Sequence, residues 1–278
     1  AVSDSQNGAV YVYKYNQGNG NWSIDWDIVG YIPNSGPSIS LSSNGSVLAI
    51  ANDKGDLKVY QRPVPDINGS WIQIGSTIEG IGAGYLVGPK TNISISSNGD
   101  RVAIGGISSD ASKINHYVGH VRVFDLQGSE WTQVGSTLNG TSTKDYFGYS
   151  LDMSNDGSIL LIGSYGVGDA KEDGLYRGLG EGKGQVSIYE FQNNQWQLGS
   201  SFDGEKNGDQ FGINVSLSGD GSTFISGADY NDGGGIFSGQ IRVFYNTFLD
   251  ISNHQIGTSY NLAYIKDYDG NLHANTGS

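Results

Sequence analysis

The sequence predicts an all-β protein built from repeated four-stranded antiparallel sheets, and three recurring patterns carry that prediction. One is a glycine followed by alternating aliphatic residues and a closing aromatic residue, which is typical of a strand with one buried face. Another is a tight Asn-Gly or Asp-Gly turn between two strands, and the third is a strand that begins with tryptophan and soon reaches glycine. The glycine-led strand occurs at residues 8–13, 55–60, 119–124, 184–189 and 239–244. Copies at intervals of about 50 to 65 residues match the repeat length of β-propeller blades, which is the fold we predict.

Within one repeat, we expect four strands in the order A, B, C and D. Strand A leads into the tight turn, at residues 44–45, 98–99, 156–157 or 220–221. Asn-Gly and Asp-Gly accept the positive φ angles of a type I′ turn, so each turn predicts a hairpin. Strand B is the apolar run that follows, at residues 47–51, 102–105, 159–163 and 224–227. Strand C is the glycine-led strand, and strand D begins at Trp26, Trp71, Trp131 or Trp196, with residues 253–257 as a copy that lacks tryptophan.

The two ends of the chain hold the two halves of one repeat. The N-terminal residues 8–30 supply only strands C and D, and the chain opens with Ala1-Val2-Ser3-Asp4, which reads as the end of a strand. Residues 261–265 and 271–275 resemble a degenerate strand A and strand B. Pairing these halves would close a ring and remove both open sheet edges. We therefore predict one domain over residues 1–278 with five blades, at about residues 38–75, 92–135, 149–199, 213–257, and 261–278 plus 1–30. An open β-solenoid or β-sandwich array is the alternative, and a longer natural chain would allow more blades.

Composition excludes several classes of function. The formal net charge of −13, from 15 basic and 28 acidic residues, argues against nucleic-acid binding, because phosphates would be repelled. The chain has no cysteine, which excludes disulfides, thiolate nucleophiles and cysteine-based zinc sites. No apolar run approaches the length of about 18 residues that a transmembrane helix needs. Glycine, at 44 residues without a period of three, predicts many tight turns between short strands.

The repeats resemble the FG-GAP class found in integrin α-chain propellers and in secreted or surface proteins of marine bacteria. The resemblance covers nearly the whole chain and rests on residues 119–124, 131–140, 145–151, 155–157 and 161–163, with residues 209–218 as a second copy of the Phe-Gly element. It implies an extracellular location and binding of protein or glycan, often with calcium. The chain departs from the family in two respects: no loop carries a full D-x-D-x-D-G motif, and Phe-Gly is absent from the first two complete repeats.

The long loops, which join strand B to C and strand D to A, should emerge on the same side of such a ring. Long loops on a rigid scaffold are where binding residues usually lie. The loop after residue 164 combines aromatic and charged side chains that could stack on a sugar or contact a protein. Its candidate ligand-binding residues are Tyr165, Asp169, Glu172, Asp173, Tyr176 and Arg177. The alternatives are a plain surface loop and a packing contact with a neighbouring subunit.

Two Asx-rich segments could hold calcium, which requires several oxygen ligands from a tight loop. The candidate ligands are Asp229, Asn231 and Asp232 in one segment, and Asp267, Asp269 and Asn271 in the other. Asx-rich turns without a metal are the alternative reading. Asp145 and Asp209, which precede Phe-Gly in the same way, are expected to accept hydrogen bonds from the loop backbone.

Enzyme chemistry has little support in the sequence, since the four histidines show no zinc-ligand pattern and no nucleophile elbow is present. The leading hypothesis is a non-catalytic extracellular module for binding or adhesion, with a protein or glycan ligand on the long-loop face. One alternative is a structural subunit of an appendage, a surface layer or a virion, which would self-assemble. Another is a carbohydrate-binding lectin, although its equivalent sites should repeat and the long loops here differ from one another.

Overall fold

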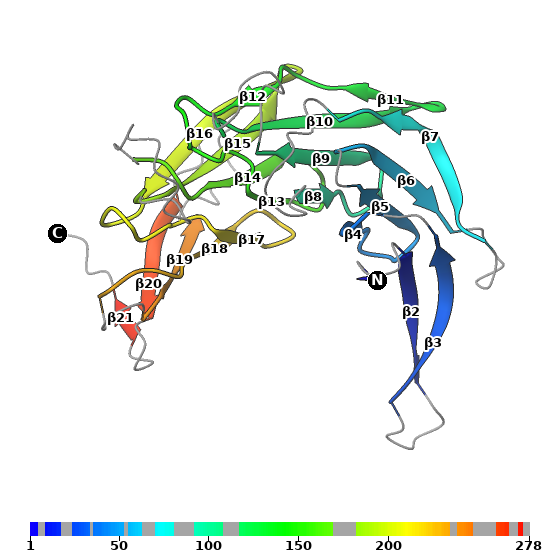
Figure 1. Cartoon of the computed structure of the whole chain (residues 1–278), viewed down its shortest axis with the longest axis horizontal. Helices are drawn as coiled ribbons and strands as arrows, with labels where there is room; N and C mark the ends of the chain where they lie inside the picture. The colour runs from blue at the N-terminus through cyan, green and yellow to red at the C-terminus, as the bar shows by residue number, and fades with distance from the viewer. Residues whose placement is uncertain are drawn as a thin grey trace, which may run out of the picture.

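The computed structural model describes residues 1–4, 9–17, 24–33, 36–52, 55–62, 70–80, 92–107, 117–168, 182–233, 238–246, 260–266 and 272–274. Within these ranges all the regular secondary structure is β, arranged in five antiparallel sheets. Figure 1 shows the sheets following one another along an arc, with the N-terminal sheet at one end and the C-terminal sheet at the other. The all-β prediction is thus confirmed, whereas a closed ring is not among the pairings of the described strands.

The sheets are numbered here in chain order. Sheet 1 contains β1 (Val2–Asp4), β2 (Ala9–Gln17) and β3 (Ile24–Ile32). Sheet 2 contains β4 (Ser38–Leu41), β5 (Val47–Ala51), β6 (Leu57–Gln61) and β7 (Ile72–Ile78). Sheet 3 contains β8 (Asn92–Ile95), β9 (Arg101–Gly106), β10 (His120–Gln127), β11 (Glu130–Gln133) and β12 (Leu138–Asn139). Sheet 4 contains β13 (Ser150–Met153), β14 (Ile159–Ser164), β15 (Gln185–Gln192) and β16 (Gln195–Asp203). Sheet 5 contains β17 (Asn214–Leu217), β18 (Thr223–Ala228), β19 (Gln240–Asn246), β20 (Tyr260–Lys266) and β21 (Leu272–Ala274).

Sheets 2 to 5 each follow the predicted A–B–C–D order through antiparallel neighbours. The hairpins between strands A and B are confirmed, but their turn type differs from the prediction. Gly45, Gly99, Gly157 and Gly221 have positive φ, whereas the Asn or Asp before each of them does not. The turn is therefore a type I turn followed by a left-handed glycine, rather than a type I′ turn, which needs positive φ at both central residues.

A serine at the start of each turn explains this geometry. In sheet 2, the Ser42 hydroxyl donates to the Asn44 side-chain oxygen (3.0 Å) and accepts from the Val47 amide (2.9 Å). The Asn44 oxygen also accepts from the Ser46 amide (2.9 Å). This local network holds the Asn or Asp residue at a negative φ and leaves the positive φ to the glycine that follows.

The C-terminal strands pair differently from the prediction. β20, which contains the predicted closing strand A at 261–265, pairs with β19 as the strand D of sheet 5, and β21 pairs with β20. β20 also carries the shift in register seen between strands C and D of sheet 4: Tyr260 lies opposite Asn246 as Trp196 lies opposite Phe191. Residues 253–257, the predicted strand D, lie outside the described residues. Residues 2–4 form the strand β1, which pairs with β2 at the place where the prediction put a C-terminal strand B.

The core lies between the sheets, because successive strand residues point to opposite faces and each of sheets 2, 3 and 4 packs on two neighbours. In β14, Leu160 and Ile162 face sheet 3, whereas Leu161 faces sheet 5, and all three are fully buried. The four buried clusters in the described part of the chain join consecutive sheets. They include Val10 with Ile50, Val59 with Val102, Val121 with Leu160, and Leu161 with Phe224.

The tryptophan of strand D packs on a glycine of the preceding sheet. Trp131 lies against Gly75, where a Cβ atom would collide with the indole ring, and its indole N–H donates to the Ile74 carbonyl at 3.0 Å. Trp196 lies against Gly135 in the same way. Both glycines have a φ of 71°, so they also need glycine for conformational reasons. In sheet 3, the tryptophan that begins the motif (Trp131) therefore packs on sheet 2, whereas the glycine that ends it (Gly135) packs on sheet 4.

Candidate functional site

The loops from strand B to C and from strand D to A meet at one edge of the sheets, which we call the loop edge. Two parallel bridges mark it, between Gly119 and Phe147 and between Gly184 and Phe211. Each bridge joins the start of a strand C to the loop that leads into the next sheet. The predicted grouping of these loops on one side is therefore seen at sheets 3 and 4.

Two Phe-Gly segments, residues 145–148 and 209–212, fix how the chain enters sheets 4 and 5. The amide of Phe147 donates to the Val118 carbonyl (3.1 Å), and that of Phe211 donates to the Lys183 carbonyl (3.0 Å). Both phenylalanine side chains are buried between sheets. The residue before each phenylalanine has positive φ, 53° at Tyr146 and 58° at Gln210. A non-glycine residue in this conformation stores local strain that the surrounding bonds must offset.

The aspartates of the Phe-Gly segments accept hydrogen bonds from the backbone of their loops, as the sequence predicts. The Asp145 carboxylate accepts from the amides of Thr141 and Ser142, both at 2.8 Å, and from the Thr141 hydroxyl at 3.0 Å. Asp209 accepts from the Lys206 amide at 2.8 Å. Both aspartates are buried, so these bonds satisfy their carboxylates and stabilise the loop backbone around each Phe-Gly segment.

A cluster of four tyrosines, Tyr117, Tyr146, Tyr149 and Tyr165, lies at the loop edge between sheets 3 and 4. The Tyr146 ring stacks between those of Tyr117 (centroids 5.2 Å apart) and Tyr165 (4.6 Å). The Tyr149 ring meets Tyr165 edge-on at 4.4 Å. Tyr165 is buried and the other three are half-buried, so the cluster forms a partly exposed aromatic surface.

Of the predicted ligand-binding residues, Tyr165 falls in this cluster, as its one buried member. The other five, Asp169, Glu172, Asp173, Tyr176 and Arg177, lie outside the described residues. Sequence reasoning missed Tyr117, Tyr146 and Tyr149. The available signal was the placement of tyrosines on both sides of Phe147-Gly148, which the second Phe-Gly segment lacks.

The first predicted calcium segment contains a structural asparagine. Asn231 is buried, its amide nitrogen donates to Asp209 (3.0 Å), and its side-chain oxygen accepts from the Gly233 amide (2.9 Å). Asp229 and Asp232 are exposed. Among the described residues, no group of three or more His, Asp or Glu side chains is placed to hold a metal ion. Asp267, Asp269 and Asn271 lie outside the described residues, so calcium binding stays a prediction.

Asp152 on β13 joins three sheets through their A strands. Its carboxylate accepts from the Ser94 hydroxyl of β8 (3.1 Å) and from the Leu217 amide of β17 (2.8 Å). The position is serine in the other complete repeats, as at Ser94 and Ser216. One carboxylate in a row of serines thus fixes sheets 3, 4 and 5 relative to one another.

A buried arginine, Arg122, and a half-buried one, Arg242, support the loop edge from within. The guanidinium of Arg242 lies over the Phe211 ring (4.5 Å to the centroid) and donates to the Asp203 carbonyl at 2.7 Å. Arg122 donates to the Glu79 carbonyl at 2.8 Å and lies over Phe124. Burial lowers the pKa of both guanidinium groups from its usual value. Both guanidinium groups thus donate to backbone carbonyls of the preceding sheet.

Comparisons with known proteins assign the chain to no family. The sequence matches no protein-family model. It also matches no curated protein sequence. Among solved structures, the chain is similar to hydrazine synthase from Kuenenia stuttgartiensis, with a TM-score of 0.49 and 12% sequence identity over 85% of this chain. The chain spans 56% of that protein's length. A similarity at this level carries no statement about activity.

No helix with the length and apolar character that bilayer crossing requires is present in the described ranges.

Proposed function

We propose that this chain is a non-catalytic extracellular binding module that presents its loop edge to a protein or glycan ligand. The tyrosine cluster is the observation that carries the proposal. It combines side chains from three separate segments, with Tyr117 before β10, Tyr146 and Tyr149 before β13, and Tyr165 after β14. Tyrosine offers a large contact area and a polar tip at low cost in conformational entropy, which suits a recognition surface.

The loop edge is also held in shape before any ligand binds. The Tyr146 amide donates to the Tyr117 carbonyl (2.9 Å), and the Tyr149 amide donates to the Tyr146 carbonyl (3.0 Å). The bonds that Asp145 accepts fix the same loop from its other side. A surface that is ordered in advance loses less entropy when a ligand binds.

An array of glycans and peptides probed with the labelled chain tests the proposal. We expect Tyr117→Ala to weaken binding of the best ligand by about tenfold or more, as for an aromatic residue in the centre of a contact. Tyr245→Ala is the matched control, because Tyr245 is exposed but lies opposite Thr223, at the far edge of sheet 5. Equal binding by both variants, or an array on which nothing binds, contradicts the proposal. Circular dichroism confirms that each variant is folded.

A further inference from the structure

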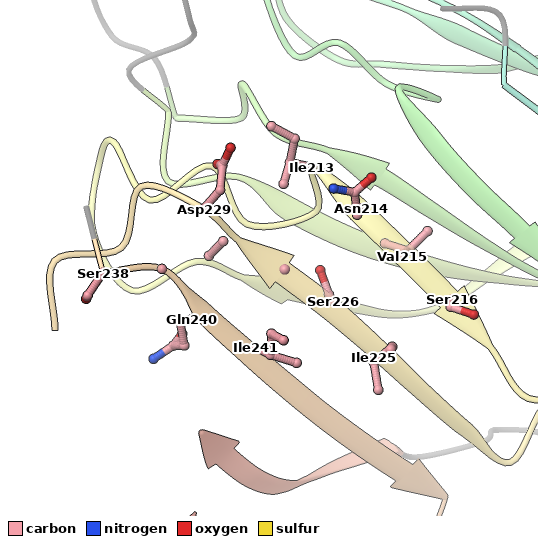
Figure 2. A pocket seen from close by; sticks show the side chains of 13 residues that line it. Ile213, Asn214, Val215, Ser216, Ile225, Ser226, Asp229, Ser238, Gln240 and Ile241 are labelled. Atoms are coloured by element: carbon pink, nitrogen blue, oxygen red, sulfur yellow. The ribbon is translucent and has the colours of Figure 1, made fainter. Parts of the chain in front are cut away.

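The turn between strands A and B of sheet 5 surrounds a carboxylate with three hydrogen-bond donors. One Asp220 oxygen accepts from the Ser218 hydroxyl (2.6 Å), the Ser222 amide (3.0 Å) and the Ser222 hydroxyl (2.8 Å). This turn joins β17 to β18, which lie side by side (Figure 2). The turn of sheet 4 repeats the arrangement at Asp156, with a serine two residues before it and another two residues after it. We call these three donor groups the donor cage.

The donor cage favours a negative charge. A carboxylate accepts hydrogen bonds without donating any, and the bonds that it accepts are stronger than those of a neutral group. The bonds from Ser218 and Ser222 accordingly lower the pKa of Asp220 to about 2. Aspartate at the centre of this cage is therefore ionised at neutral pH and is held by the serines on both sides of it.

Sheet 2 has the same cage around a neutral amide. The Asn44 oxygen accepts from the Ser42 hydroxyl (3.0 Å), the Ser46 amide (2.9 Å) and the Ser46 hydroxyl (2.6 Å). These are the same three groups, at the same places in the sequence, as those around Asp156 and Asp220. An aspartate in place of Asn44 would therefore keep all three bonds and strengthen them.

Asn44 is exposed and is followed by Gly45, a pair of residues that can lose ammonia without an enzyme. The Gly45 nitrogen attacks Cγ of Asn44, the bond from Cγ to Nδ2 breaks, and ammonia leaves with the Gly45 proton. Water then adds to Cγ of the cyclic imide, which restores the Gly45 N–H and yields an aspartate carboxylate. During the attack, negative charge develops on the oxygen that the three cage donors contact, so the cage stabilises this step.

Sheet 3 has the same Asn-Gly pair in a different environment. Asp100 stands where the other three turns have serine, and its carboxylate accepts from the Asn98 side-chain nitrogen at 2.7 Å. The Asp100 amide lies 3.4 Å from the Asn98 oxygen, so this part of the cage is weak. Conversion of Asn98 to aspartate would replace the 2.7 Å hydrogen bond with two carboxylates in contact, which repel each other. Gly99 is also buried and packs on the Val47 side chain of sheet 2.

The backbone hydrogen bond that must open before the attack is the same in both turns. The Gly45 amide donates to the Ser42 carbonyl (2.8 Å), and the Gly99 amide donates to the Ser96 carbonyl (3.0 Å). The difference between the two sites therefore lies mainly in the residue after the glycine, which is serine in sheet 2 and aspartate in sheet 3.

We propose that Asn44 is a site of spontaneous deamidation whose aspartate product the turn holds in place, and that Asp100 protects Asn98 from the same reaction. The product gives sheet 2 the Ser-x-Asp-Gly-Ser turn of sheets 4 and 5. It also adds one negative charge at the edge of the sheet opposite the loop edge. This modification is separate from ligand binding by the tyrosine cluster.

Peptide mapping by mass spectrometry tests the proposal on the intact chain, incubated at mildly alkaline pH. We expect Asn44 to convert at least about tenfold faster than Asn98 while the chain is folded, because Asn44 has the complete cage. The main product at Asn44 should be aspartate, since isoaspartate runs the chain through the side-chain carbon and does not fit this turn. In urea, where both sites are unfolded Asn-Gly pairs, the two rates should be similar.

Melting temperatures of variants test whether the turns accept the product. Asn44→Asp should melt at the wild-type temperature or above it, whereas Asn98→Asp should melt lower by about 2–4 °C. Asp100→Ser is the matched control, because it gives sheet 3 the same Ser-x-Asn-Gly-Ser turn as sheet 2. It should restore the melting temperature of Asn98→Asp and, on its own, speed the conversion of Asn98.

Equal conversion of Asn44 and Asn98 in the folded chain would overturn the proposal, as would isoaspartate as the main product at Asn44. The proposal also fails if Asn44→Asp melts as far below the wild type as Asn98→Asp does. Conversion of Asn98 at an unchanged rate in Asp100→Ser would remove the protective role of Asp100.

Discussion

Removal of the Trp131 indole tests how consecutive sheets are held together. Trp131 of sheet 3 is 8% exposed, packs on Gly75 of sheet 2 and donates a hydrogen bond to the Ile74 carbonyl. Truncation of a buried tryptophan to alanine typically costs about 3–5 kcal/mol, because contacts are lost and a cavity remains. We therefore expect Trp131→Ala to lower the free energy of unfolding by about that amount.

A substitution on the other side of this contact, at Gly75, introduces a clash instead of a cavity. Gly75→Ala places a methyl group against the indole ring and forces a left-handed conformation on alanine. The conformational cost is about 1–2 kcal/mol and is paid whatever residue stands at position 131. The clash adds about 1–3 kcal/mol and exists only when tryptophan is present.

A double-mutant cycle separates the two contributions, with urea unfolding as the assay. Gly75→Ala should cost about 1–3 kcal/mol less in the Trp131→Ala background than in the wild type. The same cycle at Gly135 and Trp196 should give a coupling of the same sign, since that pair repeats the contact one sheet further on. Additive effects at both pairs would refute the assignment of this motif to the interface between sheets.

Three further predictions concern the loops and turns. Asp145→Ala should cost about 1–3 kcal/mol in urea unfolding, because the Thr141 and Ser142 amides lose their acceptor; exposed Thr143→Ala is the control and should cost almost nothing. Hydrogen bonds from the Ser218 hydroxyl and from Ser222 lower the pKa of Asp220 to about 2. At Asp156, burial acts to raise the pKa, but hydrogen bonds from neighbouring serines outweigh it and leave the pKa lowered. A lowered pKa gives stability that is complete above the unfolded-state value of about 4 and is lost as the pH falls toward 2. The Asp156→Asn, Asp220→Asn double variant should therefore lose less stability than the wild type over that pH range, and an equal loss would contradict the assignment. The calcium hypothesis for residues 229–232 and 267–271 requires that a chelator lower the melting temperature, so an unchanged value would remove it.

The regular part of the fold could be predicted because it depends on short, local patterns. Alternating apolar residues fix each strand and each Asx-Gly turn fixes a hairpin, so strands A, B and C of sheets 2 to 5 lie close to their predicted positions. The turn type could not be read from Asn-Gly alone, because the serine two residues earlier decides it through its hydroxyl. The role of Asp145 followed from its place before Phe-Gly.

The pairing of the C-terminal strands depends on contacts that a local pattern does not contain. In β20, Tyr260 replaces the tryptophan that marks strand D elsewhere, and Ala263 stands in place of a glycine such as Gly199. β20 therefore lacks the tryptophan that identifies strand D in the sequence, yet it pairs with β19 in the same register as strand D of sheet 4 pairs with strand C. The sequence marks Tyr146 and Tyr149 by their place beside Phe147-Gly148, but it does not show that Tyr117 and Tyr165 join them, because only the packing of sheets 3 and 4 brings these loops together.

The central claim is that consecutive sheets pack through glycines that admit the backbone of the next Phe-Gly segment, and that no described residue occupies the equivalent place on sheet 5. Its most direct test compares thermal unfolding of Gly163→Val with that of Gly227→Val, since the two glycines occupy equivalent positions on sheets 4 and 5. We predict that Gly163→Val unfolds at a much lower temperature, because the new side chain collides with the Gly212 carbonyl. Gly227→Val should unfold at the wild-type temperature or slightly above it, since valine favours strands and no described residue lies within 4 Å of a Cβ atom at this position. An equal loss of stability in both variants would contradict the claim, because it would mean that the position on sheet 5 is already filled.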